Sequence, residues 1–225
     1  MIYITGDTHG ELERFSESGF PEESKLTSAD IIIVCGDFGF VFSANEKEKQ
    51  KLDALEKKPY TICFVDGNHE NFNALSSLNT EMWNGGKVHR VRKNIIHLMR
   101  GQVFSIEGKT FMTMGGAYSI DRNVRKKDVS YWDEETPNDE EYKEALKNIG
   151  MHQNKVDYVL THTAPRSVIW KIDEYPDPHD LQLTSFLETL KHELDYKHWY
   201  CGHWHLDVDV EDTFTILWFD VKRIA

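Results

Sequence analysis

The segment IYITGDTHG (residues 2–10) contains the pattern that decides the fold. A short run of β-branched and aromatic residues is followed at once by a glycine, an aspartate and a histidine. Four other apolar runs also end at residues that can bind a metal. The five runs are Ile2–Thr5, Ile31–Cys35, Thr61–Val65, Tyr158–Thr161 and Trp199–Cys201. Because they are almost wholly apolar and alternate with helical patterns, we expect strands covered on both faces in a layered α/β protein.

Three segments between these runs have helical patterns. Apolar residues at helical spacing predict a helix that begins at Pro137 after an N-cap at Thr136 and ends at Gly150. A second apolar stripe predicts a helix over residues 183–194. A weaker and mostly polar helix is expected over residues 44–57.

The rest of the chain contains predicted strands and two long loops. Phe104–Met114 has the pattern of a hairpin that turns at residues 107–109, and Thr213–Phe219 that of a late strand. Residues 117–136 and 163–180 have no periodic pattern. Long loops inside a compact domain are often functional, so we expect both to lie around a site.

Composition limits the classes of protein to consider. The 225 residues suit one domain over 1–225, and 40% hydrophobic residues exclude a disordered acidic chain. The formal net charge of −12 argues against a nucleic-acid or anionic-membrane binder, because those need a basic face. It does not exclude a small anionic substrate held by a metal.

The sequence also predicts the compartment. Three cysteines, Cys35, Cys63 and Cys201, lie in or at the end of apolar runs and are expected to be reduced core thiols. The first residues lack the basic and long apolar regions of a signal peptide, and no stretch is apolar enough for a membrane span. We therefore expect a cytoplasmic protein without a membrane partner.

Polar residues at the strand ends are the candidate site. In α/β sheets, ligands bind beyond the carboxyl ends of the strands, so these side chains should meet at one rim. A mixed set of Asp, His and Asn suits divalent Mn, Fe or Zn, and it lacks the thiolates of a structural zinc finger. Each motif alone has an ordinary explanation, such as a turn or a helix N-cap at Asn68. Five motifs in order, each at a strand end, favour a functional site.

As a set, these motifs resemble the calcineurin-like metallophosphoesterase superfamily. Its ordered signature is Asp-x-His, Gly-Asp, Gly-Asn-His-Asp/Glu, a single His, and Gly-His-x-His. The corresponding segments are DTHG (7–10), GD (36–37), GNHE (67–70), His162 and GHWH (202–205). The resemblance implies a two-layer β-sandwich flanked by helices, with two metal ions at one rim.

The resemblance also implies a role for each residue. The first metal would be bound by Asp7, His9 and His205, and the second by Asn68, His162 and His203. Asp37 would bridge both ions, and His69 would donate a proton to the leaving group. The implied reaction is hydrolysis of a phosphate ester by in-line attack of a metal-bound hydroxide, with Mn, Fe or Zn as the two ions and Mn²⁺ the expected ion in vitro.

One departure from the family pattern concerns phosphate binding. In the protein phosphatases of the superfamily, Gly-Asp continues to Asp-Arg-Gly, but here Phe40 and Val41 occupy those positions. Specialised protein phosphatase activity is therefore not expected, and a phosphate-binding arginine has to come from elsewhere. Arg122 and Arg125 are the candidates, with Arg166 a weaker one; a solvated charged loop remains the alternative for the first two.

Four functional classes compete. The first is a hydrolase of phosphomonoesters or phosphodiesters, and the second is a nuclease on the same site. A nuclease needs a basic track, and the chain offers only the short clusters Arg90–Lys93 and Arg122–Lys127. The third is a non-catalytic interaction module, which would not need a complete ligand set. The fourth, a metallo-β-lactamase type, needs a His-x-His-x-Asp-His cluster, which the chain lacks.

Two bound divalent ions would change the formal charge only from −12 to −8, but they would dominate the rim itself. We therefore expect a small phosphorylated substrate rather than long nucleic acid. The oligomeric state does not follow from the sequence.

Overall fold

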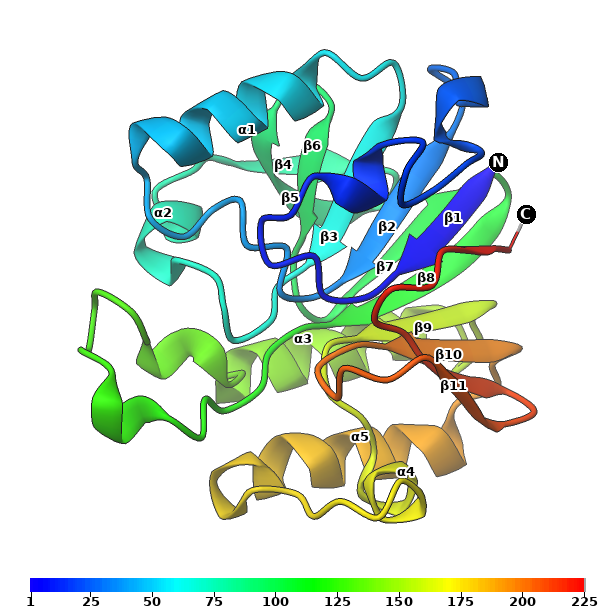
Figure 1. The fold of residues 1–225 in the computed structure, drawn as a ribbon. Helices are drawn as coiled ribbons and strands as arrows, with labels where there is room; N and C mark the ends of the chain where they lie inside the picture. Colours follow the sequence, from blue (N-terminus) through cyan, green and yellow to red (C-terminus); the bar gives the residue numbers. More distant parts are fainter. Residues whose placement is uncertain (225) are drawn as a thin grey trace.

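A computed structural model describes residues 1–224 as two mixed β-sheets packed face to face, with helices on both outer faces (Figure 1). In this part of the chain, the first sheet has the strand order β13-β1-β2-β3-β6-β5-β4 and the second β11-β12-β10-β9-β8-β7. The strands of the first sheet are β1 (Ile2–Thr5), β2 (Ile31–Cys35), β3 (Thr61–Val65), β4 (Thr80–Trp83), β5 (Gly86–Arg92), β6 (Ile95–Leu98) and β13 (Lys222–Arg223). Those of the second are β7 (Gln102–Ile106), β8 (Lys109–Met114), β9 (Tyr158–Thr161), β10 (His198–Cys201), β11 (Val208–Glu211) and β12 (Phe214–Ile216).

All five predicted strands with polar ends are confirmed. Four keep their predicted bounds, and β10 begins one residue earlier, at His198. Strands β1, β2, β3 and β6 run parallel, as do β8, β9, β10 and β12. The carboxyl ends of the parallel strands of each sheet therefore meet at one edge.

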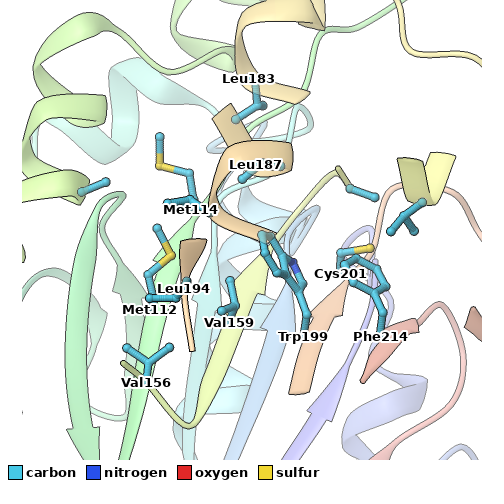
Figure 2. Packing of buried hydrophobic residues seen from close by; sticks show 14 of the residues in the cluster. Met112, Met114, Val156, Val159, Leu183, Leu187, Leu194, Trp199, Cys201 and Phe214 are labelled. Atoms are coloured by element: carbon cyan, nitrogen blue, oxygen red, sulfur yellow. The ribbon is translucent and has the colours of Figure 1, made fainter. Parts of the chain in front are cut away.

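The buried strands contribute alternate side chains to two different cores. In β1, Ile2 and Ile4 pack between the sheets, whereas Tyr3 belongs to the other hydrophobic cluster of this sheet, where its ring contacts Phe20. In β10, Trp199 faces the helix layer of the second sheet, where it lies near Val159 and Leu187 (Figure 2). Burying each such side chain contributes about 1.5–3 kcal/mol. This two-sided burial explains why the strands are apolar at nearly every position.

The helices are α1 (Glu46–Glu56), α2 (Phe72–Ser76), α3 (Asp139–Met151), α4 (Arg166–Lys171) and α5 (Leu181–Glu193). The first two lie beside the first sheet, and the last three lie on the outer side of the second (Figure 1). Thus the three predicted helices are present, although α1 and α5 have slightly different bounds. The fold is the predicted sandwich flanked by helices.

The predicted ends of α3 are wrong. Its N-cap is Asn138, whose side chain accepts hydrogen bonds from the backbone of Glu140 and Glu141, while the Glu141 carboxylate accepts from the Asn138 N–H. This reciprocal capping box is not available to Thr136. At the other end, Gly150 is helical and the helix continues to Met151.

The hairpin is confirmed, but the late strand is shorter than predicted. Glu107 and Gly108 turn between β7 and β8 with φ of 49° and 72°, the conformation that tight hairpin turns require. Strand β12 ends at Ile216, not at Phe219. The N–H groups of residues 218–220 donate to the Asp207 carboxylate at 2.7–3.0 Å instead of to a neighbouring strand.

Several elements were not expected from the sequence. They include the β4–β6 meander, the edge strands β11 and β13, and the short helices α2 and α4, the last within the predicted loop 163–180. The three cysteines are buried and unpaired. Among the described residues, no helix is both long and apolar enough to cross a membrane.

Candidate metal centre

The candidate ligands converge where the two sheets meet. Asp7, Asp37 and Asn68 follow parallel strands of the first sheet, and His162 and His203 follow strands of the second. The motifs that are far apart in the sequence therefore reach one rim because parallel strands end at the same edge.

Three histidine and carboxylate side chains form a first donor group. His9 Nε2 lies 3.0 Å from His205 Nε2, and His205 Nε2 lies 3.5 Å from Asp7 Oδ2. Asp37 Oδ2 is 3.8 Å from His9 Nε2 and borders the same group.

A second donor group surrounds His162 Nε2. It lies 3.0 Å from Asn68 Oδ1, 3.2 Å from His203 Nδ1 and 3.4 Å from Asp37 Oδ1. His162 Nδ1 is 3.0 Å from the Cys35 carbonyl, to which it donates, so Nε2 keeps a free lone pair. The two oxygens of Asp37 thus face different donor groups.

These spacings and this chemistry fit two divalent ions. Two donors that bind one ion at about 2.1 Å and at right angles lie about 3 Å apart. The separations within both groups, 3.0–3.8 Å, are close to that value. Asp7 Oδ1 also lies 3.5 Å from His162 Nδ1, but that nitrogen is committed to the Cys35 carbonyl. Asp7 therefore groups with His9 and His205.

The protonation of these side chains suits metal binding. Burial, together with the neighbouring His162, lowers the pKa of His203 to about 3, so His203 is neutral at pH 7. Burial opposes ionisation of Asp37, but the histidines around it, His162 foremost, outweigh burial and lower its pKa to about 2. Burial, with the charge of Asp37, raises the pKa of Asp7. A cation beside these two carboxylates would favour the ionised form of both.

Four of the candidate ligands have strained backbones. His9, Asp37, His203 and His205 have φ between 45° and 69°, a region that non-glycine residues seldom occupy. Such strain costs about 1–3 kcal/mol per residue and persists where the surroundings enforce it, often at functional sites.

Comparison with known proteins agrees with this geometry. The sequence pattern of the family described as calcineurin-like phosphoesterase matches residues 1–207. The chain belongs to the calcineurin-like phosphoesterase family. It is also similar to lariat debranching enzyme A from Xenopus laevis, with 26% identity over 185 residues. That match covers 74% of this chain but only 33% of the debranching enzyme, so the chain spans about a third of that relative's length.

Two glycines of the motifs leave room for the donors. A Cβ at Gly67 would lie 2.1 Å from Asp37 Oδ1, and a Cβ at Gly36 would lie 2.1 Å from His162 Nδ1. Gly36 also has a φ of 87°. The motif glycines are therefore needed to let the ligands approach one another.

His69 lies beside the donor groups and contacts Arg125. Its backbone N–H donates to Asp37 Oδ1 at 2.8 Å, and its Nε2 lies 3.1 Å from Arg125 Nη2. Because a guanidinium only donates, His69 Nε2 is the acceptor and the ring is neutral in this state. Burial lowers the pKa of His69, and the charge of Arg125 adds to the lowering.

The structure brings only one of the three candidate arginines to the centre. Arg125 lines the cavity beside the ligands. Arg122 instead pairs with the buried Glu135 at 2.8 Å and packs over the Tyr118 ring, and it is not among the cavity-lining residues. Arg166 is the first residue of α4 and does not line the cavity either.

Sequence reasoning missed the residues that orient the ligands. Asn68 Nδ2 donates to Ser119 Oγ at 3.0 Å, and the Ser119 N–H donates to Glu135 at 3.2 Å. Glu70 accepts from the N–H groups of Gly39 and Gly67, which ties two ligand loops together. The position of Glu70 in the GNHE motif was visible in the sequence, but nothing local distinguishes Ser119.

A cavity of about 470 Å³ lies beside the donor groups. Its lining includes Asp37, Asn68, His69, His203 and His205. The remaining walls come from residues 118–125 and 163–184 and from Trp204. The expectation that both long loops surround the site is confirmed.

Proposed function

We propose that this protein hydrolyses phosphate esters at a centre of two divalent ions, with Asp7, His9, Asp37, Asn68, His162, His203 and His205 as ligands. The observation that carries the proposal is the position of Asp37, whose Oδ1 and Oδ2 lie 3.4 Å and 3.8 Å from donors of two separate groups. Membership of the calcineurin-like phosphoesterase family supports it.

The side chains around the centre would divide the work. Two bound divalent ions would polarise the phosphoryl oxygens and lower the pKa of bound water. Asp37 and the histidines would hold the ions, and Glu70 and Ser119 fix the loops from which the ligands project. A phosphoryl oxygen between Arg125 and His69 would accept a hydrogen bond from each. Its negative charge would offset the repulsion between these two side chains when His69 is protonated. His69 then passes its proton to the departing oxygen.

A nuclease is the second candidate, and the similarity to lariat debranching enzyme A favours it. The net charge of −12 opposes a long polyanionic substrate. A non-catalytic module is the third candidate, but it would not require the complete donor set. We therefore favour a small phosphorylated substrate and Mn²⁺ as the ion that supports activity in vitro.

The proposal is tested with purified protein that has been stripped of metal and then supplied with Mn²⁺. Hydrolysis of an aryl phosphomonoester, an aryl phosphodiester and single-stranded DNA is measured beside the metal content. We expect Mn²⁺ to restore ester hydrolysis, and Asp37→Asn to reduce it more than about 100-fold because a ligand shared by both ions is weakened. Asp212→Asn, which changes an exposed carboxylate with no side-chain partner among the described residues, is the control. Activity that survives both chelation and Asp37→Asn would exclude the two-metal mechanism.

A further inference from the structure

The cavity beside the metal centre is large enough for the organic group of a phosphate ester. It has a volume of about 470 Å³, and His69, His203 and His205 line the end at which the phosphate would bind. Residues 118–121 and 174–177 also line the cavity. The chemistry of these walls therefore selects the organic group.

The walls are strongly acidic. Besides the metal-centre residues, four carboxylates line the cavity, namely Asp121, Glu174, Asp177 and Asp180. Arg125 is the only lysine or arginine among the described lining residues, and Asp121 pairs with it at 2.8 Å. Of the other three, Asp177 Oδ1 lies 2.8 Å from His179 Nδ1, whereas Glu174 and Asp180 have no basic partner among the described residues. They repel a polyanion and attract a cation.

Two of these carboxylates lie at different depths. Asp180, at the base, is only 4% exposed, and both of its oxygens accept from the single N–H of Tyr118 at 2.9 Å. A carboxylate has about four acceptor positions, so most of its capacity is unused. Glu174 is exposed, and its carboxylate has no hydrogen-bond or ion-pair partner among residues 1–224. Both carboxylates can therefore face a bound cation, and they can also accept hydrogen bonds from a cation that carries N–H groups.

Aromatic side chains accompany the carboxylates. Tyr175 is 82% exposed at the mouth and makes no ring contact with another described residue, and Trp204 lines the wall beside His203. Aromatic faces next to carboxylates are the usual surroundings of bound ammonium groups. A neutral or anionic group would gain less from this combination.

We propose that the substrate of this phosphoesterase is a phosphate ester whose organic group carries a quaternary or primary ammonium, held in this cavity by Asp180, Glu174 and Tyr175. The inference rests on the proposed function, because the phosphate has to bind at the metal centre for the organic group to reach these residues.

A matched pair of substrates tests the charge alone. The first is the 4-nitrophenyl diester of choline phosphate, and the second is its 3,3-dimethylbutyl isostere, in which a neutral carbon replaces the nitrogen. In both, water adds to phosphorus, the bond to the 4-nitrophenyl oxygen breaks, and 4-nitrophenol leaves. We expect kcat/KM to be about tenfold higher for the cationic ester, mainly through KM, since that ratio corresponds to one well-placed ion pair or cation–π contact.

Two variants locate the preference within the cavity. Asp180→Asn and Glu174→Gln each remove one charge, and both should bring the ratio of the two kcat/KM values closer to one. The exposed Glu174 can be changed without affecting a contact of the fold. Glu193→Gln, an exposed carboxylate at the end of α5, is the matched control and should leave the ratio unchanged.

Calorimetric binding of choline phosphate and of 3,3-dimethylbutyl phosphate provides a readout that does not need turnover. Hydrolysis of both esters with equal kcat/KM would overturn the inference and leave the proposed function intact. Equal affinities of the two monoesters would likewise overturn it. Tighter binding of choline phosphate without hydrolysis of any ester would instead support the cavity assignment and contradict the proposed function.

Discussion

In the proposed mechanism, the contact between His69 and Arg125 would link proton transfer to phosphate binding. In this state the 3.1 Å contact keeps His69 unprotonated at Nε2, the atom that would face the leaving group. An anionic phosphoryl group between the two side chains would remove that restriction. The two residues therefore act together only when substrate is present.

Replacing His69 separates catalysis from metal binding. We expect His69→Ala to keep the metal content of the wild type, because the other side chains supply the donors. Turnover should fall about 10²–10⁴-fold, the usual contribution of a general acid. The loss should be largest for esters with poor leaving groups, as measured across a series of aryl phosphates. Loss of metal in this variant would show that His69 is a ligand or a structural residue instead.

Arg122 is expected to act on stability rather than on substrate binding. Arg122→Ala would leave the buried Glu135 without its ionic partner, which should lower the free energy of unfolding by about 3 kcal/mol at pH 7. Burial already raises the pKa of Glu135, and the loss of Arg122 raises it further.

The destabilisation caused by Arg122→Ala should depend on pH through Glu135. A folded-state pKa above the unfolded value means that ionised Glu135 destabilises the fold at neutral pH, and that protonation relieves the penalty as the pH falls. The difference in stability between wild type and Arg122→Ala should thus shrink from pH 7 to pH 5 in denaturant titrations. A KM effect without a change in stability would restore Arg122 as a substrate-binding residue.

The contrast between Arg122 and Arg125 shows where sequence reasoning about the site stops. Asp7, Asp37 and His162 follow apolar runs directly, so their positions are set by the strands. The two arginines lie three residues apart in an irregular loop, where the backbone path decides which side chain reaches the cavity. The role of Ser119 could not be predicted for the same reason, since its contact with Asn68 joins residues 51 positions apart.

At the level of elements, the strand–loop junctions depend on close packing that only glycine permits. Gly67→Ala would place a methyl group 2.1 Å from Asp37 Oδ1 and displace the Asp37 carboxylate. We expect this variant to lose metal and activity. Gly150→Ala is the matched control, because its Cβ meets no atom within 4 Å and the residue is helical. It should gain about 0.5–1 kcal/mol of stability and keep its metal, as measured by metal analysis and thermal unfolding. Equal metal contents in the two variants would contradict the packing argument.

Element prediction succeeded where burial imposed a clear pattern. Strands β1, β2, β3 and β9 are covered on both faces and read as continuous apolar runs. Strand β5 carries two arginines, a lysine and a histidine in seven residues, so its sequence does not resemble a buried strand. Helix α4 has only six residues, which is too short for a helical period to appear.

At the level of the whole molecule, the candidate metal centre lies where the two sheets meet. Asp7, Asp37 and Asn68 project from the first sheet, and His162 and His203 project from the second. Bound ions would therefore cross-link the two sheets at one rim, in addition to the hydrophobic core between them. Without them, the three buried hydrophobic clusters still hold the layers together.

Metal binding should accordingly stabilise the fold without being needed for it. A ligand at 100 times its Kd adds about 2.7 kcal/mol, and 1 kcal/mol shifts the Tm of a chain of this size by about 2–4 °C. We expect Mn²⁺ to raise the Tm of the metal-free protein by about 5–10 °C. His162→Ala removes a donor of the second sheet and should abolish most of this shift. His192→Ala, an exposed histidine on α5, should retain it. A full shift in His162→Ala would mean that the ions bind the first sheet alone and do not join the two.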